Sequence, residues 1–169
     1  ALMSLVHFPD MWLELAKWHE SEGRIDEAVS VLERAREAIP GCALLHFAAA
    51  DCEETRGNVA GARAVYESLI DEHEKKAAEA AATAAAEGAA AGVGVGVGAE
   101  VGGVGARGGD AYVHPPMDNT TLLVYIEYMR CVRRMEGQQP ARKAFMRARK
   151  APGLRWEMFA AAAQLEWRY

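Results

Sequence analysis

The sequence predicts an all-α fold, a right-handed solenoid of stacked helical hairpins interrupted by a low-complexity insert. First, a pattern of small and apolar residues repeats after 34 residues, so that Gly23 and Ala28 correspond to Gly57 and Ala62. Second, apolar residues within each copy recur at helical spacing. Third, residues 88–109 hold 10 of the 16 glycines. A fixed period of this size is typical of stacked hairpins, because one hairpin cannot bury its apolar face alone.

The first hairpin is predicted between residues 11 and 40. Asp10 is expected to cap a helix over 11–20, and Asp26 to cap the helix that follows. Gly23 separates the two helices, and the Pro-Gly pair at 40–41 ends the second. The spacing predicts two inward-facing stripes, Trp12, Leu15, Ala16 and Trp18 on the first helix and Ala28, Val31, Leu32 and Ala35 on the second.

The second hairpin is predicted from helices over 44–55 and 60–72, joined by a turn at 56–58. Residues 73–91 are rich in Ala, Glu and Lys, so the second helix is expected to continue as an exposed helix. The Gly-Val tract at 88–109 contains nothing that offsets the entropy of ordering a chain, which predicts disorder.

The third hairpin is predicted from helices over 120–134 and 140–150, with a fourth copy beginning after the Pro-Gly pair at 152–153. Ala62 and Ala141 are 79 residues apart, which is one period plus 45 inserted residues. We therefore divide the chain into residues 1–72 with two repeats, residues 73–118 with the helix extension and insert, and residues 119–169 with the third repeat and the first helix of a fourth.

The repeat predicts which residues form the core. A small residue stands at Ala28, Ala62 and Ala141, where the two helices of a hairpin cross closely and a larger side chain would separate them. Four residues later a larger side chain fills the adjacent space. The expected repeat-core residues are Trp12, Trp18, Ala28, Leu32, Ala62, Tyr66, Tyr125, Tyr128, Ala141 and Phe145.

Charge is distributed unevenly along the chain. Residues 1–72 carry 6 Lys and Arg against 14 Asp and Glu, whereas residues 120–155 carry 9 against 2. This asymmetry indicates either solvated helix faces or two docking surfaces of opposite charge. The basic cluster consists of Arg130, Arg133, Arg134, Arg142, Lys143 and Arg147, with Arg149 and Lys150 beyond it.

An acidic protein partner or a solvated face suits this basic cluster better than RNA. Single-stranded RNA sites normally add exposed aromatic rings on which bases stack. The nearby Tyr125, Tyr128 and Phe145 fall on repeat-core positions instead. We therefore expect RNA contact to be indirect or weak.

No motif predicts catalysis, a metal or a cofactor. The three cysteines form no CxxC pair, and the five histidines show no ligand spacing. Glu53 and Glu54 are adjacent acids, but a carboxylate pair needs convergence from separate elements, so a structural anchor is favoured. Residues 103–108 spell GxGxxG without the strand and helix that a phosphate site requires. No run of about 18 apolar residues predicts a membrane span.

Three segments resemble a known family. Residues 62–67 (Ala-Arg-Ala-Val-Tyr-Glu) are similar to the HAT, or half-a-tetratricopeptide, repeat. Residues 44–54 (Leu-Leu-His-Phe-Ala-Ala-Ala-Asp-Cys-Glu-Glu) and 121–137 resemble the suppressor-of-forked family, the large HAT subunit of cleavage stimulation factor. The resemblance covers all but about residues 73–118. The long insert departs from the family, whose members connect these repeats briefly.

The resemblance implies a non-catalytic scaffold in nuclear pre-mRNA 3′-end cleavage and polyadenylation. In the family, this region contributes to a homodimer, and the full subunit binds an RNA-recognition-motif subunit and a WD40 subunit. One alternative is a HAT scaffold of splicing or pre-rRNA processing. Another is a generic tetratricopeptide-like module that grips peptides, although its Gly-x-x-Tyr step and closing Pro do not recur here in register.

Deletion of residues 88–109 should leave the helical circular-dichroism signal and the melting temperature nearly unchanged. The free energy of loop closure grows only slowly with loop length, so a shorter connection should be neutral or mildly stabilising. A large loss of helical signal would show that this segment packs against the fold.

Overall fold

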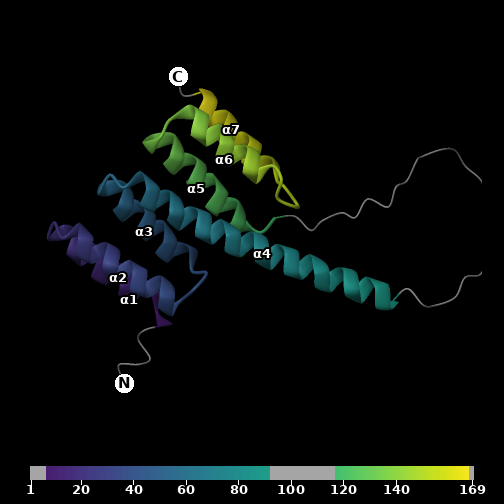
Figure 1. The fold of residues 1–169 in the computed structure, drawn as a ribbon, viewed down its shortest axis with the longest axis horizontal. Coiled ribbons are helices and arrows are strands. Elements are labelled where there is room, and N and C mark those ends of the chain that lie inside the picture. The colour runs from purple at the N-terminus through teal and green to yellow at the C-terminus, as the bar shows by residue number, and fades with distance from the viewer. Residues whose placement is uncertain (1–6, 92–116, 168–169) are drawn as a thin grey trace, which may run out of the picture.

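The computed structural model describes residues 7–91 and 117–167. Within these ranges the chain forms seven helices and no strand. The helices are α1 (Pro9–Ser21), α2 (Ile25–Ala38), α3 (Ala43–Thr55), α4 (Val59–Ala91), α5 (Asn119–Met135), α6 (Gln138–Ala148) and α7 (Trp156–Trp167). They stack from α1 and α2 at one end to α6 and α7 at the other (Figure 1). This all-α stack confirms the predicted fold class.

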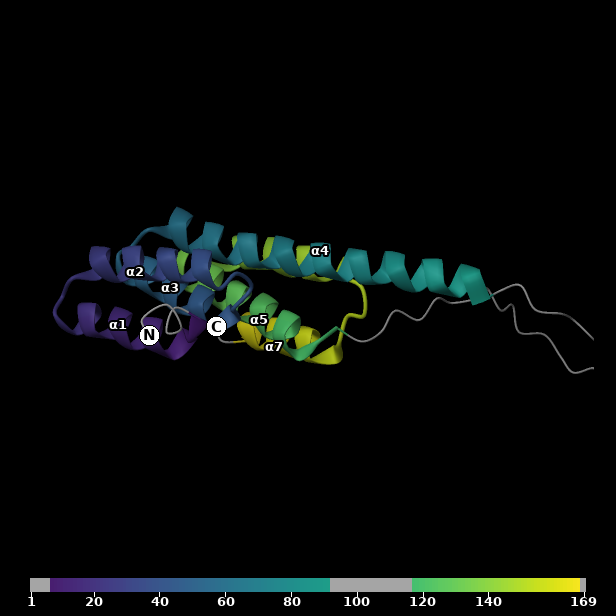
Figure 2. The ribbon, with the colours of Figure 1, turned by 90° about the horizontal axis from the view of Figure 1, so that it is seen from below.

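Two layers of helices form the stack. The first helices of the hairpins, α1, α3, α5 and α7, make the A layer, and the second helices, α2, α4 and α6, make the B layer (Figure 2). The backbones of neighbouring A-layer helices approach one another closely, whereas those of neighbouring B-layer helices lie farther apart, and α4 and α6 are linked through the side chain of Arg147. The closer spacing of the A layer bends the stack, so the A layer lies on its inner side.

Glycine makes the turn inside each complete hairpin. Gly23, Gly57 and Gly137 have φ angles of +73°, +77° and +97°, a left-handed conformation that other residues adopt only with strain. A Cβ atom built on each of these glycines would meet nothing within 4 Å. The repeat therefore uses glycine at these turns for its backbone conformation and not for its small size.

The hairpin crossings are tightly packed. Ala28 and Ala62 are 0% exposed and Ala141 is 6% exposed. Leu32 and Tyr66, four residues after the first two alanines, are also buried. The Tyr66 ring lies 6.0 Å from that of Phe47 and 5.7 Å from that of Tyr128, so it joins the second hairpin to the third. Tyr125 is buried too, and the half-buried Phe145 packs edge-on against Phe159.

Trp18 does not belong to the core, contrary to the expectation from the repeat. It is 51% exposed, with the Arg24 guanidinium 4.6 Å from its ring centroid. The equivalent Cys52 and Cys131 are buried against the preceding hairpin. Among the described helices, α2 and α3 contact α1, and neither of them covers Trp18. Trp12 is partly buried against the core.

The two predicted helix caps are also wrong, each by two positions, since the N-cap residues are Phe8 and Arg24. Helix α1 begins at Pro9, and α2 at Ile25. Asp10 and Asp26 therefore lie inside the first turns, where a carboxylate favours the positive end of the helix dipole. Asp26 also accepts a hydrogen bond of 3.0 Å from Arg56.

Helix α4 runs for 33 residues and extends far past the helices beside it (Figure 1). The predicted extension through residue 91 is confirmed. Residues 88–91, which we expected to be disordered, belong to this helix, because the alanines after Gly88 favour helix strongly. The rest of the Gly-Val tract and its GxGxxG motif lie outside the described residues.

The chain re-enters the stack at a fixed point. The Asp118 side chain caps α5 by accepting hydrogen bonds from the backbone N–H groups of Thr120 and Thr121. The backbone N–H of the buried Met117 donates to the Gly153 carbonyl at 2.8 Å, which ties the start of α5 to the α6–α7 turn.

Replacement of Ala62 by leucine should destabilise the fold by about 1–3 kcal/mol, because the added atoms must enter a fully packed crossing. Ala84→Leu is the matched control, since Ala84 is exposed on the α4 extension. Chemical denaturation monitored by circular dichroism measures both effects. Equal losses at the two positions would contradict the repeat register.

Candidate protein-docking surface

The acidic and basic parts of the chain meet inside the molecule. Arg134 of α5 donates two hydrogen bonds to Glu54 of α3, of 2.7 Å from Nε and 2.6 Å from Nη2. Arg147 of α6 donates to Glu74 of α4 at 3.1 and 2.9 Å, and also to Asp71. We call this contact between the second and third hairpins the repeat seam. Some of the acids of residues 1–72 and some of the arginines of residues 120–155 therefore pair with one another between repeats.

Buried tyrosines extend the repeat seam. The Tyr125 hydroxyl donates to Glu74 at 2.5 Å, and the Tyr128 hydroxyl donates to Glu67 at 2.8 Å. Glu67 also pairs with Arg63 at 2.9 Å. A buried hydroxyl without a partner would be costly, so these carboxylates compensate for the burial of two large rings.

The repeat seam holds its carboxylates ionised. The hydrogen bonds from Arg134 lower the pKa of Glu54, and those from Arg147 lower the pKa of Glu74. Burial raises the pKa of Tyr125 and Tyr128 above the ordinary tyrosine range, so both hydroxyls remain donors. The contact therefore requires charged acids and neutral phenols.

The remaining members of the basic cluster point to different places. Arg130 pairs with Glu127 on its own helix at 2.6 Å. Arg142 donates two hydrogen bonds to Glu166 of α7, at 2.6 and 2.7 Å. Lys143 is exposed on the B layer. Of the six predicted docking residues, Arg130, Arg133 and Arg134 line one groove, whereas Arg142, Lys143 and Arg147 lie on α6 and do not line it, a distribution that the sequence alone did not suggest.

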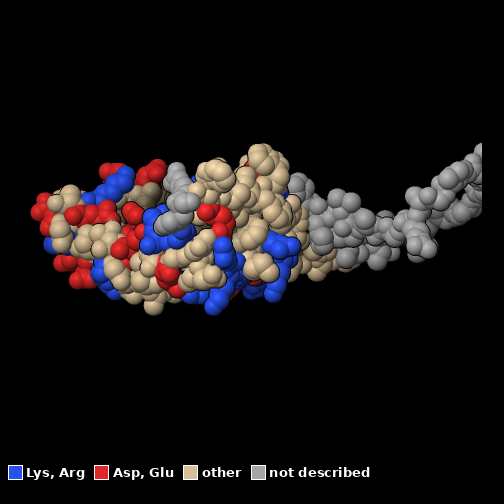
Figure 3. Space-filling model, turned by 90° about the horizontal axis from the view of Figure 1, so that it is seen from above, with Lys and Arg blue, Asp and Glu red and all other residues tan. Residues whose placement is uncertain are grey.

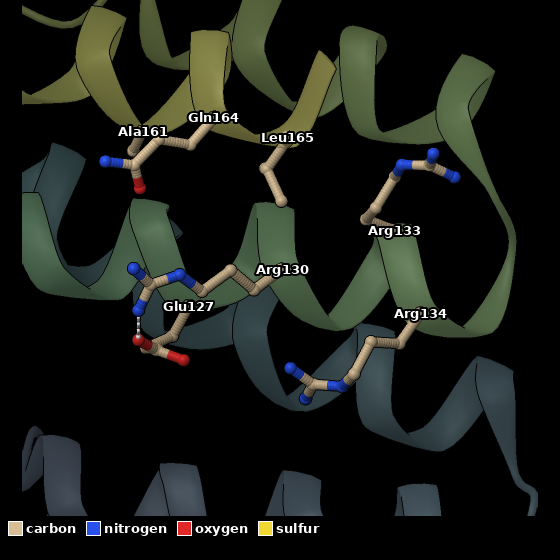
Figure 4. Close-up of a pocket in the computed structure, with 7 residues that line it drawn as sticks. All are labelled: Glu127, Arg130, Arg133, Arg134, Ala161, Gln164 and Leu165. Atoms are coloured by element: carbon tan, nitrogen blue, oxygen red, sulfur yellow. Dashed lines mark hydrogen bonds and ion pairs between the residues drawn. The ribbon is translucent and has the colours of Figure 1, made fainter. Parts of the chain in front are cut away.

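An open groove lies between α5 and α7 on the A layer and encloses about 630 Å³ (Figure 4). Its floor includes Ala161 and Leu165, and Arg130 with its partner Glu127 stands along one side. The Arg134 side chain points away from α7, toward the repeat seam. The groove is lined by Glu127, Arg130, Arg133, Arg134, Ala161, Gln164 and Leu165.

A second, smaller groove of about 310 Å³ follows between α3 and α5. Its apolar residues are Phe47, Ala48 and Tyr66, and its acids are Asp51, Glu54 and Glu127. Both grooves share Glu127 and Arg134, so they adjoin on the inner side of the stack. One groove is mainly acidic and its neighbour mainly basic.

The α6–α7 end carries a third, largely apolar groove of about 560 Å³, whose lining includes Phe145 and Phe159. Figure 3 looks onto this end and shows uncharged surface beside Lys and Arg side chains. On α7, Phe159 and Ala163 occupy the repeat positions of His46 and Ala50, which are buried in the second hairpin. Here Phe159 is 47% exposed. This face matches one that receives a B-layer helix elsewhere in the stack.

The groups that could carry chemistry have structural roles. Glu53 is buried and accepts a 2.8 Å hydrogen bond from Asn58, whose own oxygen accepts one from the Gly61 N–H at the start of α4. It therefore anchors the turn of its own hairpin. The three cysteines are free, and burial raises the pKa of Cys52 to about 12 and that of Cys131 to about 11.

Among the described residues, no cluster of His, Cys, Asp and Glu side chains could hold a metal ion. None of the helices in the same part of the chain is long and apolar enough to cross a membrane. The features that remain to be explained are the A-layer grooves and the charges along them.

Comparison with known proteins agrees with the hairpin architecture. The model of the suppressor of forked protein matches residues 1–169. The chain belongs to the suppressor-of-forked family. It is 30% identical over 164 residues to cleavage stimulation factor subunit 77 of Arabidopsis thaliana, covering 97% of this chain and 16% of that protein. It is 30% identical over 191 residues to the mRNA 3′-end-processing protein RNA14 of Cryptococcus neoformans, covering 95% and 18%. The chain thus spans less than a fifth of these relatives.

Glu54→Gln should weaken the fold at neutral pH by at most about 1 kcal/mol, because it removes a bidentate ion pair in which Glu54 is mostly buried but Arg134 is about half exposed and screened by solvent. A carboxylate whose pKa is lowered by folding stabilises the native state above its unfolded pKa. That stability is lost as the pH falls through the folded pKa. Melting temperatures from pH 7 to pH 3 should therefore fall less steeply for the variant than for the parent.

Glu33→Gln is the control for this experiment, since Glu33 is exposed and makes no ion pair among the described residues. Its pH profile should match that of the parent protein. If Glu54→Gln also matched the parent at every pH, the Arg134–Glu54 contact would not stabilise the repeat seam.

Proposed function

We propose that this chain is a non-catalytic scaffold segment that acts in nuclear pre-mRNA 3′-end cleavage and polyadenylation. The observation that carries the proposal is the family membership over the whole chain, joined to named relatives of 3′-end processing. The architecture supports it, because a stack of hairpins offers extended surfaces to other proteins. The buried thiols and the structural role of Glu53 fit a protein that binds and does not catalyse.

The partners in this proposal are other subunits of the 3′-end processing machinery. The family resemblance suggests an RNA-recognition-motif subunit, a WD40 subunit and a second copy of the full-length protein. The segments 1–72 and 119–169 would act as one surface, since the repeat seam joins them. A scaffold of splicing or pre-rRNA processing has less support, because both named relatives belong to 3′-end processing.

Within this scaffold, we assign docking to the A-layer grooves beside Arg130. Arg134 and Arg147 are less suitable as docking residues, because their guanidinium groups already serve the repeat seam. RNA is a poorer occupant than protein. Phosphates would meet Asp51, Glu54 and Glu127 on the same surface, and the nearby tyrosines are buried.

Affinity purification of the tagged full-length protein from nuclear extract should recover 3′-end processing subunits. Arg130→Glu should reduce recovery of at least one of them several-fold, because a rim charge sets partner choice more than stability. Lys143→Glu is the matched control, since it reverses an exposed charge on the B layer. Recovery of splicing or pre-rRNA factors in place of 3′-end subunits would overturn the proposed function. Equal recovery with Arg130→Glu would overturn the assignment of the docking surface.

A further inference from the structure

One repeat position carries a row of exposed polar residues across the A layer. Lys17, Asp51, Arg130 and Gln164 are equivalent by the repeat register, one on each A-layer helix, and all four are exposed. Three residues earlier, Glu14 pairs with Lys17 at 3.0 Å, as Glu127 pairs with Arg130. From α1 to α7, the residues of this row are therefore basic, acidic, basic and neutral.

Two members of this row retain unused binding capacity. Asp51 forms no ion pair within the described part of the chain, although it borders the α3–α5 groove. Arg130 donates to Glu127 only from Nη1, so its remaining guanidinium donors face the α5–α7 groove. An exposed pair such as this contributes little stability, so a ligand carboxylate can share or replace Glu127 at low cost.

The floor beneath this row is apolar on α3 and α7 and acidic on α5, where Glu127 occupies the repeat position of Ala48 and Ala161. Ala48 and Ala161 are equivalent by the repeat register and line the two grooves, which adjoin through Glu127 and Arg134. The small alanines leave room for a chain to cross the helices. Its charged side chains would meet Asp51 on one helix and Arg130 on the next.

The spacing of the helices selects the conformation of such a chain. Packed helices lie about 8–10 Å apart. A polyproline II segment has three residues per turn and rises about 3.1 Å per residue, so side chains three residues apart share one face at about 9.3 Å. A β-strand instead places residues three apart on opposite faces. The polyproline II repeat therefore matches the repeat of the A layer.

We propose that the A-layer grooves bind a proline-rich segment of a partner protein in the polyproline II conformation, with a basic and an acidic residue three positions apart. The basic side chain pairs with Asp51 and the acidic one with Arg130, and the residues between them pass over Ala48 and beside the Glu127–Arg130 pair. The inference rests on the proposed scaffold function and names the partner chemistry of its docking surface.

The test uses this chain and two fluorescent peptides of the same composition, measured by anisotropy at physiological salt. The probe is acetyl-Pro-Pro-Arg-Pro-Pro-Glu-Pro-Pro-amide, and in the control peptide the Glu is moved one position toward the Arg. We expect the probe to bind at least fivefold more tightly than the control. Equal affinity for both peptides, or no binding of the probe at millimolar concentration, would overturn the proposal.

Single charge reversals then test which residues of the protein bind the charged side chains of the peptide. Asp51→Arg should bind the probe at least tenfold more weakly and should gain affinity for the same peptide with Glu in place of Arg. Arg130→Glu should gain affinity for the peptide with two Arg residues. Lys143→Glu should bind the probe like the parent protein, and circular dichroism should show that all variants melt alike. Failure of both gains of affinity would overturn the proposal.

Two further outcomes separate this proposal from others. If a uridine-rich 12-mer RNA binds more tightly than the probe and loses affinity steeply with added salt, the surface is a nucleic-acid site and the proposal fails. If the full-length protein recovers 3′-end processing subunits while the probe does not bind, only the polyproline II inference fails. If the probe binds as expected while those subunits are absent, the proposed function fails and the peptide site remains.

Discussion

The repeat seam is the contact on which the arrangement of the second and third hairpins depends. Four residues separate α2 from α3, whereas 27 separate α4 from α5. The guanidinium groups of Arg134 and Arg147 and the hydroxyls of Tyr125 and Tyr128 make directional hydrogen bonds across this contact, and these bonds fix one register between the two hairpins.

The repeat seam accounts for part of the charge difference between residues 1–72 and residues 120–155. A count of charges predicts either solvated faces or docking surfaces, because it treats every side chain as free. In the fold, Glu54, Glu74 and their two arginines satisfy one another, which leaves a smaller set of charges to face a partner. Arg130 and Asp51 belong to this smaller set, because packing between repeats does not use them.

Most of the fold could be predicted from the sequence, since a 34-residue period fixes the faces of the helices and Gly23 and Gly57 mark their turns. The period cannot reveal whether a neighbouring hairpin covers a given face, which is why Trp18 was placed in the core. Nor could it predict the repeat seam, because the partners of Arg134 and Arg147 lie 73 to 80 residues away in the neighbouring repeat, on the other side of the insert. The candidate grooves likewise arise only when the A layer is assembled.

A solenoid separates the residues that fold it from those that give it a function. The crossing position stays small at Ala28, Ala62 and Ala141, because any larger side chain would part the helices of a hairpin. The exposed A-layer position changes from Lys17 to Asp51 to Arg130, since nothing packs against it. Charge at that position can therefore vary from one repeat to the next without cost to the fold. The stack fixes the spacing of these charges, and their order along the stack would determine which charged segment can bind.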